Sequence, residues 1–193
     1  HKKFKIMKNV KKAILGIGIL SAGLLSAQSA EMTNMLKIGG NVGIAAPSTN
    51  ASANLGLDVA YQHLVTPGFG LGIATGYNHF FGKDNDGIEN NDFGVVPVAG
   101  LIRVYPKQTG FYFGTDLGYA FITGDENVAA NAPVARPDGG FYLKPELGWH
   151  NRHWNVALQY TKVFTGSKGD LPGQDFNAAS LGLGVTYNIP LGE

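Results

Sequence analysis

The sequence has no cysteine among its 193 residues. A disulfide, a cysteine-ligated zinc, a thiol nucleophile and an acylated N-terminal cysteine are therefore all excluded. Charged residues are scarce as well, at 15% against about 25% in typical soluble domains. After the first thirty residues, no segment reaches the ~18 consecutive apolar residues that indicate a transmembrane helix. The length predicts one domain. The absence of cysteine and of long apolar runs means that this domain contains neither disulfides nor transmembrane helices.

Basic residues are concentrated at the start of the chain. Six of the fifteen lysines and arginines precede position 13, and no acidic residue comes before Glu31. Without residues 1–30, nine basic and fourteen acidic side chains remain, a net charge of −5. A chain with that balance has no basic patch, so we expect no nucleic-acid partner.

The first thirty residues have the pattern of a secretory leader. Lys8, Lys11 and Lys12 precede an apolar run over 13–27, and small residues follow that run. This order predicts a cleaved signal peptide over 1–30, with the cut after Ala27, Ser29 or Ala30. A membrane anchor is the alternative, but a run of fifteen residues falls short of the ~20 that span a bilayer.

Glycine is abundant, at 28 residues, about twice the usual ~7%. Much of it lies in segments with a period of two. In 69–78, for example, Phe69, Leu71 and Ile73 alternate with glycine and alanine. Each such segment has about the 9–11 residues of a tilted transmembrane strand. The eight segments are 36–45, 54–62, 69–78, 94–105, 111–121, 141–150, 154–164 and 179–189.

The less apolar face of these segments decides the fold class. A soluble barrel fills its interior with valine, isoleucine and leucine. Here the second face holds glycine, alanine, amides and charges, so the apolar face must point outward, as lipid requires. In hydrocarbon every backbone polar group must be paired, and the sheet must therefore close. The sequence predicts an all-β fold, an eight-stranded antiparallel up-and-down transmembrane β-barrel over 31–193.

Connection lengths and aromatic residues agree with an outer-membrane barrel. The turns at 66–68, 106–110 and 151–153 are short, whereas the stretches 82–92, 123–138 and 165–178 are long and polar. Short periplasmic turns and long extracellular loops are typical of such barrels. Aromatic residues at the strand ends predict two interface girdles. The periplasmic girdle is Tyr61, Phe69, Phe111, Trp149, Trp154 and Tyr187, and the outer girdle is Tyr77, Phe121, Phe141 and Phe164.

Three segments, 97–105, 114–119 and 180–187, carry a family resemblance. They resemble the small outer-membrane barrels of the OmpA transmembrane-domain, OmpX and OmpW type. The resemblance implies a bacterial outer-membrane location, with lipid and lipopolysaccharide as surroundings. It also implies an assembly signal for the barrel-insertion machinery at Ser180, Gly182, Val185 and Tyr187. The chain departs from the family by continuing from Asn188 to Glu193.

Charged residues on the inward face are the candidate site. These residues are Asp58, Arg103, Asp116, Lys144 and Glu146. In a narrow lumen they should pair through charge-assisted hydrogen bonds, with the planar fork of Arg103 as the hub. One interpretation is a plug, because eight strands leave an interior just wide enough for side chains. The other is a proton or ion path through the same groups.

Other candidate motifs fail. The acidic stretch 83–92 resembles a calcium loop, but aligning Gly87 with the EF-hand glycine puts Gly82 and Phe93 at ligand positions. A solvated loop or a loosely held cation remains. His79 is the one histidine near the outer end of a strand, and no serine matches its height. No hydrolase, metal or phosphate motif is present, so we expect no catalytic residue, cofactor or bound metal.

Four functions are consistent with these patterns. The first is a non-enzymatic outer-membrane barrel with a plugged lumen and a structural or surface-interaction role. The second is an OmpW-like barrel that passes small hydrophobic molecules into the membrane. That role needs an apolar upper lumen, where the inward positions are mostly glycine, alanine and asparagine. The others are a lipid A-modifying barrel enzyme and a soluble ligand-binding barrel.

Overall fold

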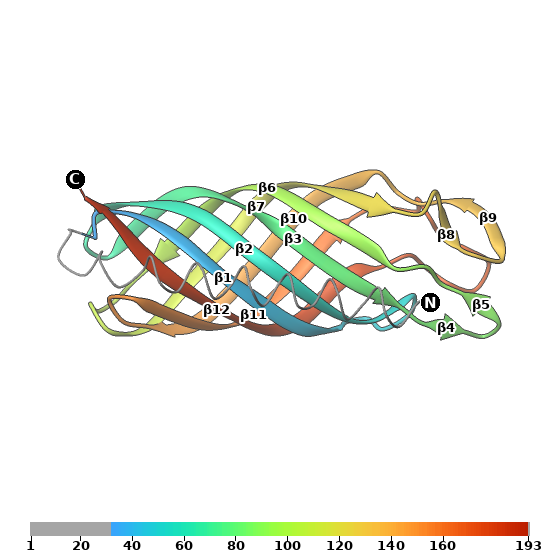
Figure 1. The fold of residues 1–193 in the computed structure, drawn as a ribbon, viewed down its shortest axis with the longest axis horizontal. Helices are drawn as coiled ribbons and strands as arrows, with labels where there is room; N and C mark the ends of the chain where they lie inside the picture. The colour runs from blue at the N-terminus through green and yellow to red at the C-terminus, as the bar shows by residue number, and fades with distance from the viewer. Residues whose placement is uncertain (1–31, 193) are drawn as a thin grey trace, which may run out of the picture.

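Eight long strands close into an antiparallel barrel in the computed structural model, which describes residues 32–192. Figure 1 shows the strands winding steeply around the long axis of the molecule. They follow one another around the barrel in the order β1-β12-β11-β10-β7-β6-β3-β2. The barrel strands are β1 (Asn34–Ala45), β2 (Ala51–Thr66), β3 (Phe69–Gly82), β6 (Phe93–Val104), β7 (Gly110–Gly124), β10 (Gly139–His150), β11 (Trp154–Phe164) and β12 (Ala178–Gly192).

The predicted fold class is confirmed, and every predicted segment matches a barrel strand to within one residue at its ends or lies inside it. The last strand, β12, pairs with both β11 and β1 and so closes the sheet. The predicted signal peptide lies outside the described residues. Within 32–192, no helix has the length and apolar character needed to cross a membrane.

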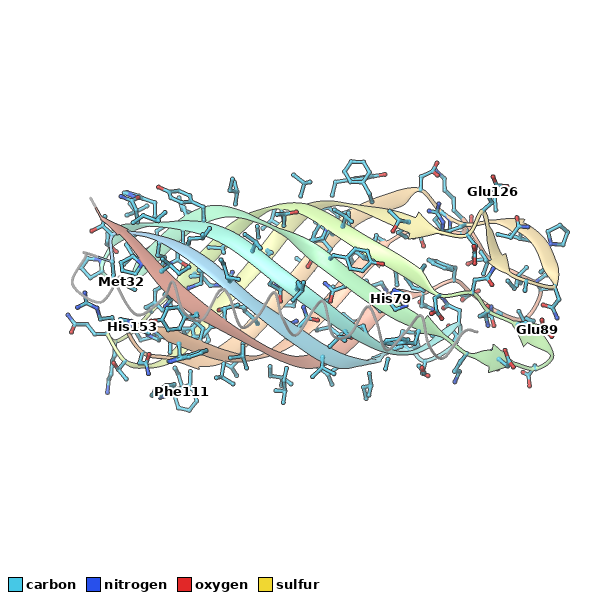
Figure 2. All side chains as sticks on the ribbon, in the orientation of Figure 1. Met32, His79, Glu89, Phe111, Glu126 and His153 are labelled. Carbon is cyan, nitrogen blue, oxygen red and sulfur yellow. The ribbon has the colours of Figure 1, made fainter. Side chains whose placement is uncertain are left out.

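Large apolar side chains cover the outside of the barrel. Ile73 is 67% exposed and Phe111 is 71% exposed, and Phe111 points away from the barrel in Figure 2. The same strands bury amides and charged groups on their other face. Exposed apolar residues recur on every barrel strand, among them Val42, Leu55, Leu57, Val98, Phe113, Leu147, Leu158 and Leu183. Water does not favour a surface of this kind, whereas hydrocarbon does.

Inward glycines let the strands approach one another closely. A Cβ added at Gly72 would lie 1.8 Å from the backbone oxygen of Tyr61 on β2. At Gly39, the same Cβ would lie 1.9 Å from the backbone oxygen of Val185 on β12. Only a residue without a side chain fits where two paired strands lie this close together. The abundance of glycine thus follows from closing a small, strongly coiled barrel.

The connections alternate in length as predicted, and two of the long ones contain hairpins. These hairpins are β4 (Asp84–Asn85) with β5 (Ile88–Glu89), and β8 (Asn127–Ala129) with β9 (Ala132–Ala135). Asp86 and Gly87 take positive φ angles of 47° and 80° in the first turn, which is the geometry that an Asp-Gly pair favours. Both hairpins extend beyond one end of the barrel (Figure 1).

The long loops are joined to one another. The backbone nitrogen of Asn91 donates to the oxygen of Val128 at 2.9 Å, and Ala130 donates to Glu89 at 2.8 Å. Gln174, from the third long loop, exchanges two side-chain hydrogen bonds with Asn90, at 2.9 and 2.8 Å. Both amides are buried. The long loops at this end of the barrel therefore form one folded unit, which we call the roof (residues 83–92, 125–138 and 165–177).

The lumen below the roof contains alanine and asparagine, as expected, but also large apolar side chains that the sequence analysis did not place there. An apolar cluster fills it below the roof. Strand β3 continues to Phe80 and β6 begins at Phe93, and both rings point inward and stack with centroids 4.8 Å apart. Phe176 of the roof packs on Phe93 at 5.0 Å. Other members are Val95, Ile122, Val128, Tyr142, Val163 and Leu171.

Replacing Gln174 by leucine is expected to loosen the roof. The buried Oδ1 of Asn90 loses the hydrogen bond that Gln174 donates to it, which costs about 1–3 kcal/mol. Trypsin should then cut the folded protein faster after Lys83 and Lys168, which both lie in roof loops. Gln108→Leu, a change in an exposed turn at the other end, is the control. Equal resistance of both variants to trypsin would show that the amide pair does not hold the loops.

Candidate functional site: the charged lumen

Four barrel strands supply the five charged residues predicted to face inward. Asp58 lies on β2, Arg103 on β6 and Asp116 on β7, while Lys144 and Glu146 both lie on β10. Their apolar neighbours along each strand point outward because successive strand residues alternate between faces. All five side chains line one small cavity inside the barrel, so the structure brings the whole predicted set together.

Arg103 makes the shortest ion pairs of the set. Its Nη1 lies 2.8 Å from Oδ1 of Asp116, and its Nε lies 2.8 Å from Oε1 of Glu146. The arginine side chain is 4% exposed, and the two carboxylates are 2% and 7% exposed. Nη1 also donates to the backbone oxygens of Ile102 and Thr115. One planar guanidinium thus holds two carboxylates from neighbouring strands.

Lys144 extends the chain of charges. Its Nζ lies 3.1 Å from Oδ2 of Asp116 and 3.7 Å from Oδ1 of Asp58. Asp116 therefore lies between two cations, with one oxygen toward each. The charges alternate in sign along the path Glu146, Arg103, Asp116, Lys144 and Asp58. Each of these five buried charges therefore has a neighbour of opposite sign, which offsets the cost of burial.

Neutral groups lengthen this path at both ends. Tyr112 donates to Oε1 of Glu146 at 2.9 Å, and Asn41 donates to Oδ2 of Asp58 at 2.7 Å. Asn54 then donates to Oδ1 of Asn41 and to Oδ1 of Asn78, at 2.9 and 3.0 Å. The connected polar groups come from β1, β2, β3, β6, β7 and β10. The network therefore ties together six of the eight barrel strands.

Lys37 is a sixth charged residue of the lumen, and the sequence analysis missed it. It is buried and lines the same cavity. Its Nζ donates to Oδ1 of Asn188 at 2.8 Å, and Asn155 donates to the same oxygen. Lys37 lies between Leu36 and Ile38 on β1, so the period-two pattern could have placed it inward. With Lys37, the described lumen contains three cations and three anions.

Little space remains among these side chains. The cavity they line has about 30 Å³ of space for water, enough for about two molecules. Toward the end of the barrel opposite the roof, the rings of Tyr105, Tyr112 and His150 contact one another, with centroids 4.5–5.7 Å apart. A wider cavity of about 690 Å³ opens beyond them, lined by Met35, Leu64 and His150 among others. Toward the roof, the apolar cluster follows.

His79 belongs to a polar chain on the outward face. Its Nε2 lies 3.0 Å from Oδ2 of Asp92, and its Nδ1 lies 3.2 Å from the hydroxyl of Tyr77. Figure 2 places His79 toward the roof end of the barrel. The hydroxyl beside the His79 imidazole belongs to Tyr77. A hydrolase with a serine, histidine and acid triad would need a serine at that position. Among residues 32–192, no three acidic or histidine side chains gather as a metal site would require.

The four residues of the predicted assembly signal all lie on β12. Ser180 and Gly182 belong to the inward face, while Val185 and Tyr187 belong to the outward face. The Tyr187 ring packs edge-on against Trp154 at 4.9 Å and stacks with His153. Strand β12 extends past Tyr187 and pairs with β1 as far as Gly192.

An eight-stranded closed barrel that is apolar outside and charged inside belongs to the class of small transmembrane β-barrels. No protein-family model and no curated protein matches the sequence. Solved structures do match it. The outer membrane protein OprG from Pseudomonas aeruginosa is 15% identical, with 81% of this chain and 95% of that chain covered and a TM-score of 0.53.

Two other solved barrels are similar in extent. The attachment invasion locus protein Ail of Yersinia pestis is 13% identical, covers 80% of this chain and 97% of its own, and has a TM-score of 0.49. The N-terminal barrel domain of Pseudomonas aeruginosa OprF is 12% identical, covers 81% and 98%, and has a TM-score of 0.46. The match to OprG confirms, at the level of the fold, the resemblance to small outer-membrane barrels.

Proposed function

We propose that this chain is a non-enzymatic barrel of the bacterial outer membrane. Its lumen is plugged, and its role is structural or lies in contacts that the roof makes at the cell surface. The carrying observation is the inversion of the barrel: exposed leucine, isoleucine, valine and phenylalanine surround buried Arg103, Asp116 and Lys144. That arrangement is stable in hydrocarbon and unfavourable in water.

The packing of the lumen supports the plug. Ion pairs and amides occupy its middle. Phe80 and Phe93 lie between them and the roof, and Phe176 of the roof packs on Phe93. A hydrated ion crossing the barrel would have to displace both layers. If the lumen is plugged and the barrel wall contacts lipid, the roof is the part of the protein that can bind partners at the cell surface. The roof has nine acidic residues and three basic ones, so cationic partners suit it best.

Assembly from the periplasmic side fits the last strand. Ser180, Gly182, Val185 and Tyr187 lie on β12, which closes the sheet by pairing with β1. In this proposal the barrel-insertion machinery reads these four residues before β12 and β1 pair. Lipid and lipopolysaccharide then surround the apolar face.

Fractionation of expressing cells tests the location. The protein is expected in the outer-membrane fraction, extracted only by detergent, and shifted in gel migration when heated. Recovery from the periplasm without detergent would favour a soluble barrel instead. The lipid A of the same cells should keep its mass, and an altered mass would favour the enzymatic alternative that the Tyr77, His79 and Asp92 chain raises.

The apolar cluster favours one second candidate, a barrel that passes small hydrophobic molecules from the surface into the membrane. Phe80, Val95 and Ala120 have no exposed surface, so such a path requires the cluster to open. A path of this kind predicts that Phe80→Ala changes uptake of a hydrophobic dye by cells. The plugged barrel predicts the same uptake with and without the protein.

A further inference from the structure

One charged side chain faces outward from the barrel wall. Among the eight barrel strands within residues 32–192, Lys162 on β11 is the only lysine, arginine, aspartate or glutamate on the outward face. Its chain neighbours Thr161 and Val163 are buried inside. Across the sheet it lies opposite Leu143 of β10 and Ala179 of β12. A cation in an otherwise apolar surface needs a partner of opposite charge.

The lysine lies near the roof end of its strand and reaches toward that end. Nζ lies over the ring of Phe164, 4.9 Å from its centroid, and Phe164 is the last residue of β11. Phe141 of β10 lies opposite Phe164, with ring centroids 5.7 Å apart. Lysine stems pack on apolar surface while their ammonium groups extend to the membrane interface. The ammonium of Lys162 thus lies level with Phe141 and Phe164, two residues of the predicted outer girdle.

We infer that Lys162, with Phe141 and Phe164, binds a phosphate group of lipid A in the outer leaflet. The ammonium pairs with the phosphate, and the two rings and Leu143 contact the acyl chains below it. This inference rests on the proposed outer-membrane function, because the roof end must face the outer leaflet. The acidic roof repels phosphate groups. Lys162, as the one charged residue on the outward face of the described barrel strands, is therefore the position on the wall where an anionic lipid is expected to bind.

Thermal unfolding of the detergent-folded, full-length protein tests the site. Diphosphorylated lipid A, added to uncharged detergent micelles, should raise the unfolding temperature in a saturable way. Lys162→Gln should need about fivefold more lipid A for the same shift, the effect of one lysine near an anionic membrane surface. Lys162→Arg keeps the charge and should behave like the unchanged protein. Lys168→Gln removes a roof lysine and should also behave like it.

Two further lipids separate the possible sources of the effect. Dephosphorylated lipid A should give no Lys162-dependent shift, and phosphatidylglycerol at equal phosphate should give a weaker one. An equal response of Lys162→Gln and the unchanged protein would overturn the inference, as would an equal effect of phosphatidylglycerol. Heat-modifiable migration shows in each case that the variant forms the barrel. A heat-modifiable protein without the lipid A effect contradicts this site alone, whereas a chain that is folded and soluble without detergent contradicts the proposed function.

Discussion

Replacing Arg103 by alanine is expected to cause one of the largest losses of stability that a single change can produce in this barrel. The change removes both short ion pairs, to Asp116 and to Glu146. Asp116 keeps its ion pair with Lys144, but Glu146 loses the one ion pair that it makes among residues 32–192 and stays buried. Breaking a buried ion pair by deleting one partner costs about 3–5 kcal/mol. When samples are heated to increasing temperatures before gel electrophoresis, the band of the folded form should therefore disappear at a much lower temperature.

Two companion variants separate charge from geometry. Arg103→Lys retains the charge but lacks the planar fork, so it should recover part of the lost stability. Lys107→Ala removes a cation from an exposed turn and should leave the unfolding temperature unchanged, since exposed charges contribute little. If Arg103→Ala unfolds at the temperature of the unchanged protein, Arg103 is not the hub of the lumen.

Gly72→Ala is expected to prevent most of the chain from forming the barrel. The new Cβ would lie 1.8 Å from the backbone oxygen of Tyr61, and a backbone atom has no rotamer by which to move away. Overpacking of an ordinary core costs about 1–3 kcal/mol. The clash between the added Cβ and the backbone of the paired strand β2 should cost at least as much. The measurement is the fraction of refolded protein that shows heat-modifiable migration.

Gly100→Ala is the matched control for this change. It lies on the neighbouring strand β6, and its nearest atom is 3.7 Å from the added Cβ, an ordinary contact distance. The Gly100 variant should refold like the unchanged protein. Equal refolding of both variants would show that the tight crossing of β2 and β3 is not needed for closure.

The alternation of apolar and small or polar residues predicted the barrel because lipid outside and a narrow lumen inside impose a period of two on every strand. The same rule placed Arg103 and Asp116 inward and could have placed Lys37 there. It did not find the apolar outer lumen. Two adjacent phenylalanines, Phe80 and Phe81, interrupt the alternation where β3 continues into the roof.

The roof is held together by contacts that no local sequence pattern predicts. Asn90 and Gln174 are 84 residues apart, and each resembles an ordinary polar loop residue. Their pairing follows from the way the closed barrel brings its loops together at one end. The Asp86-Gly87 turn, by contrast, is a local signal. The expectation for 83–92 was a solvated loop, although the Asp-Gly pair could have predicted the hairpin; nothing local could have predicted the packing of one loop on another.

Conductance in planar bilayers tests the proposed plug of the lumen most directly. Protein that migrates as the folded form before heating is inserted into the bilayer, and the current is recorded under an applied voltage. The paired charges around Arg103 and the apolar cluster around Phe80 predict no steady channel. A steady open channel, absent when the unfolded chain is added instead, would contradict the plug and favour an ion path through Asp58, Asp116 and Lys144.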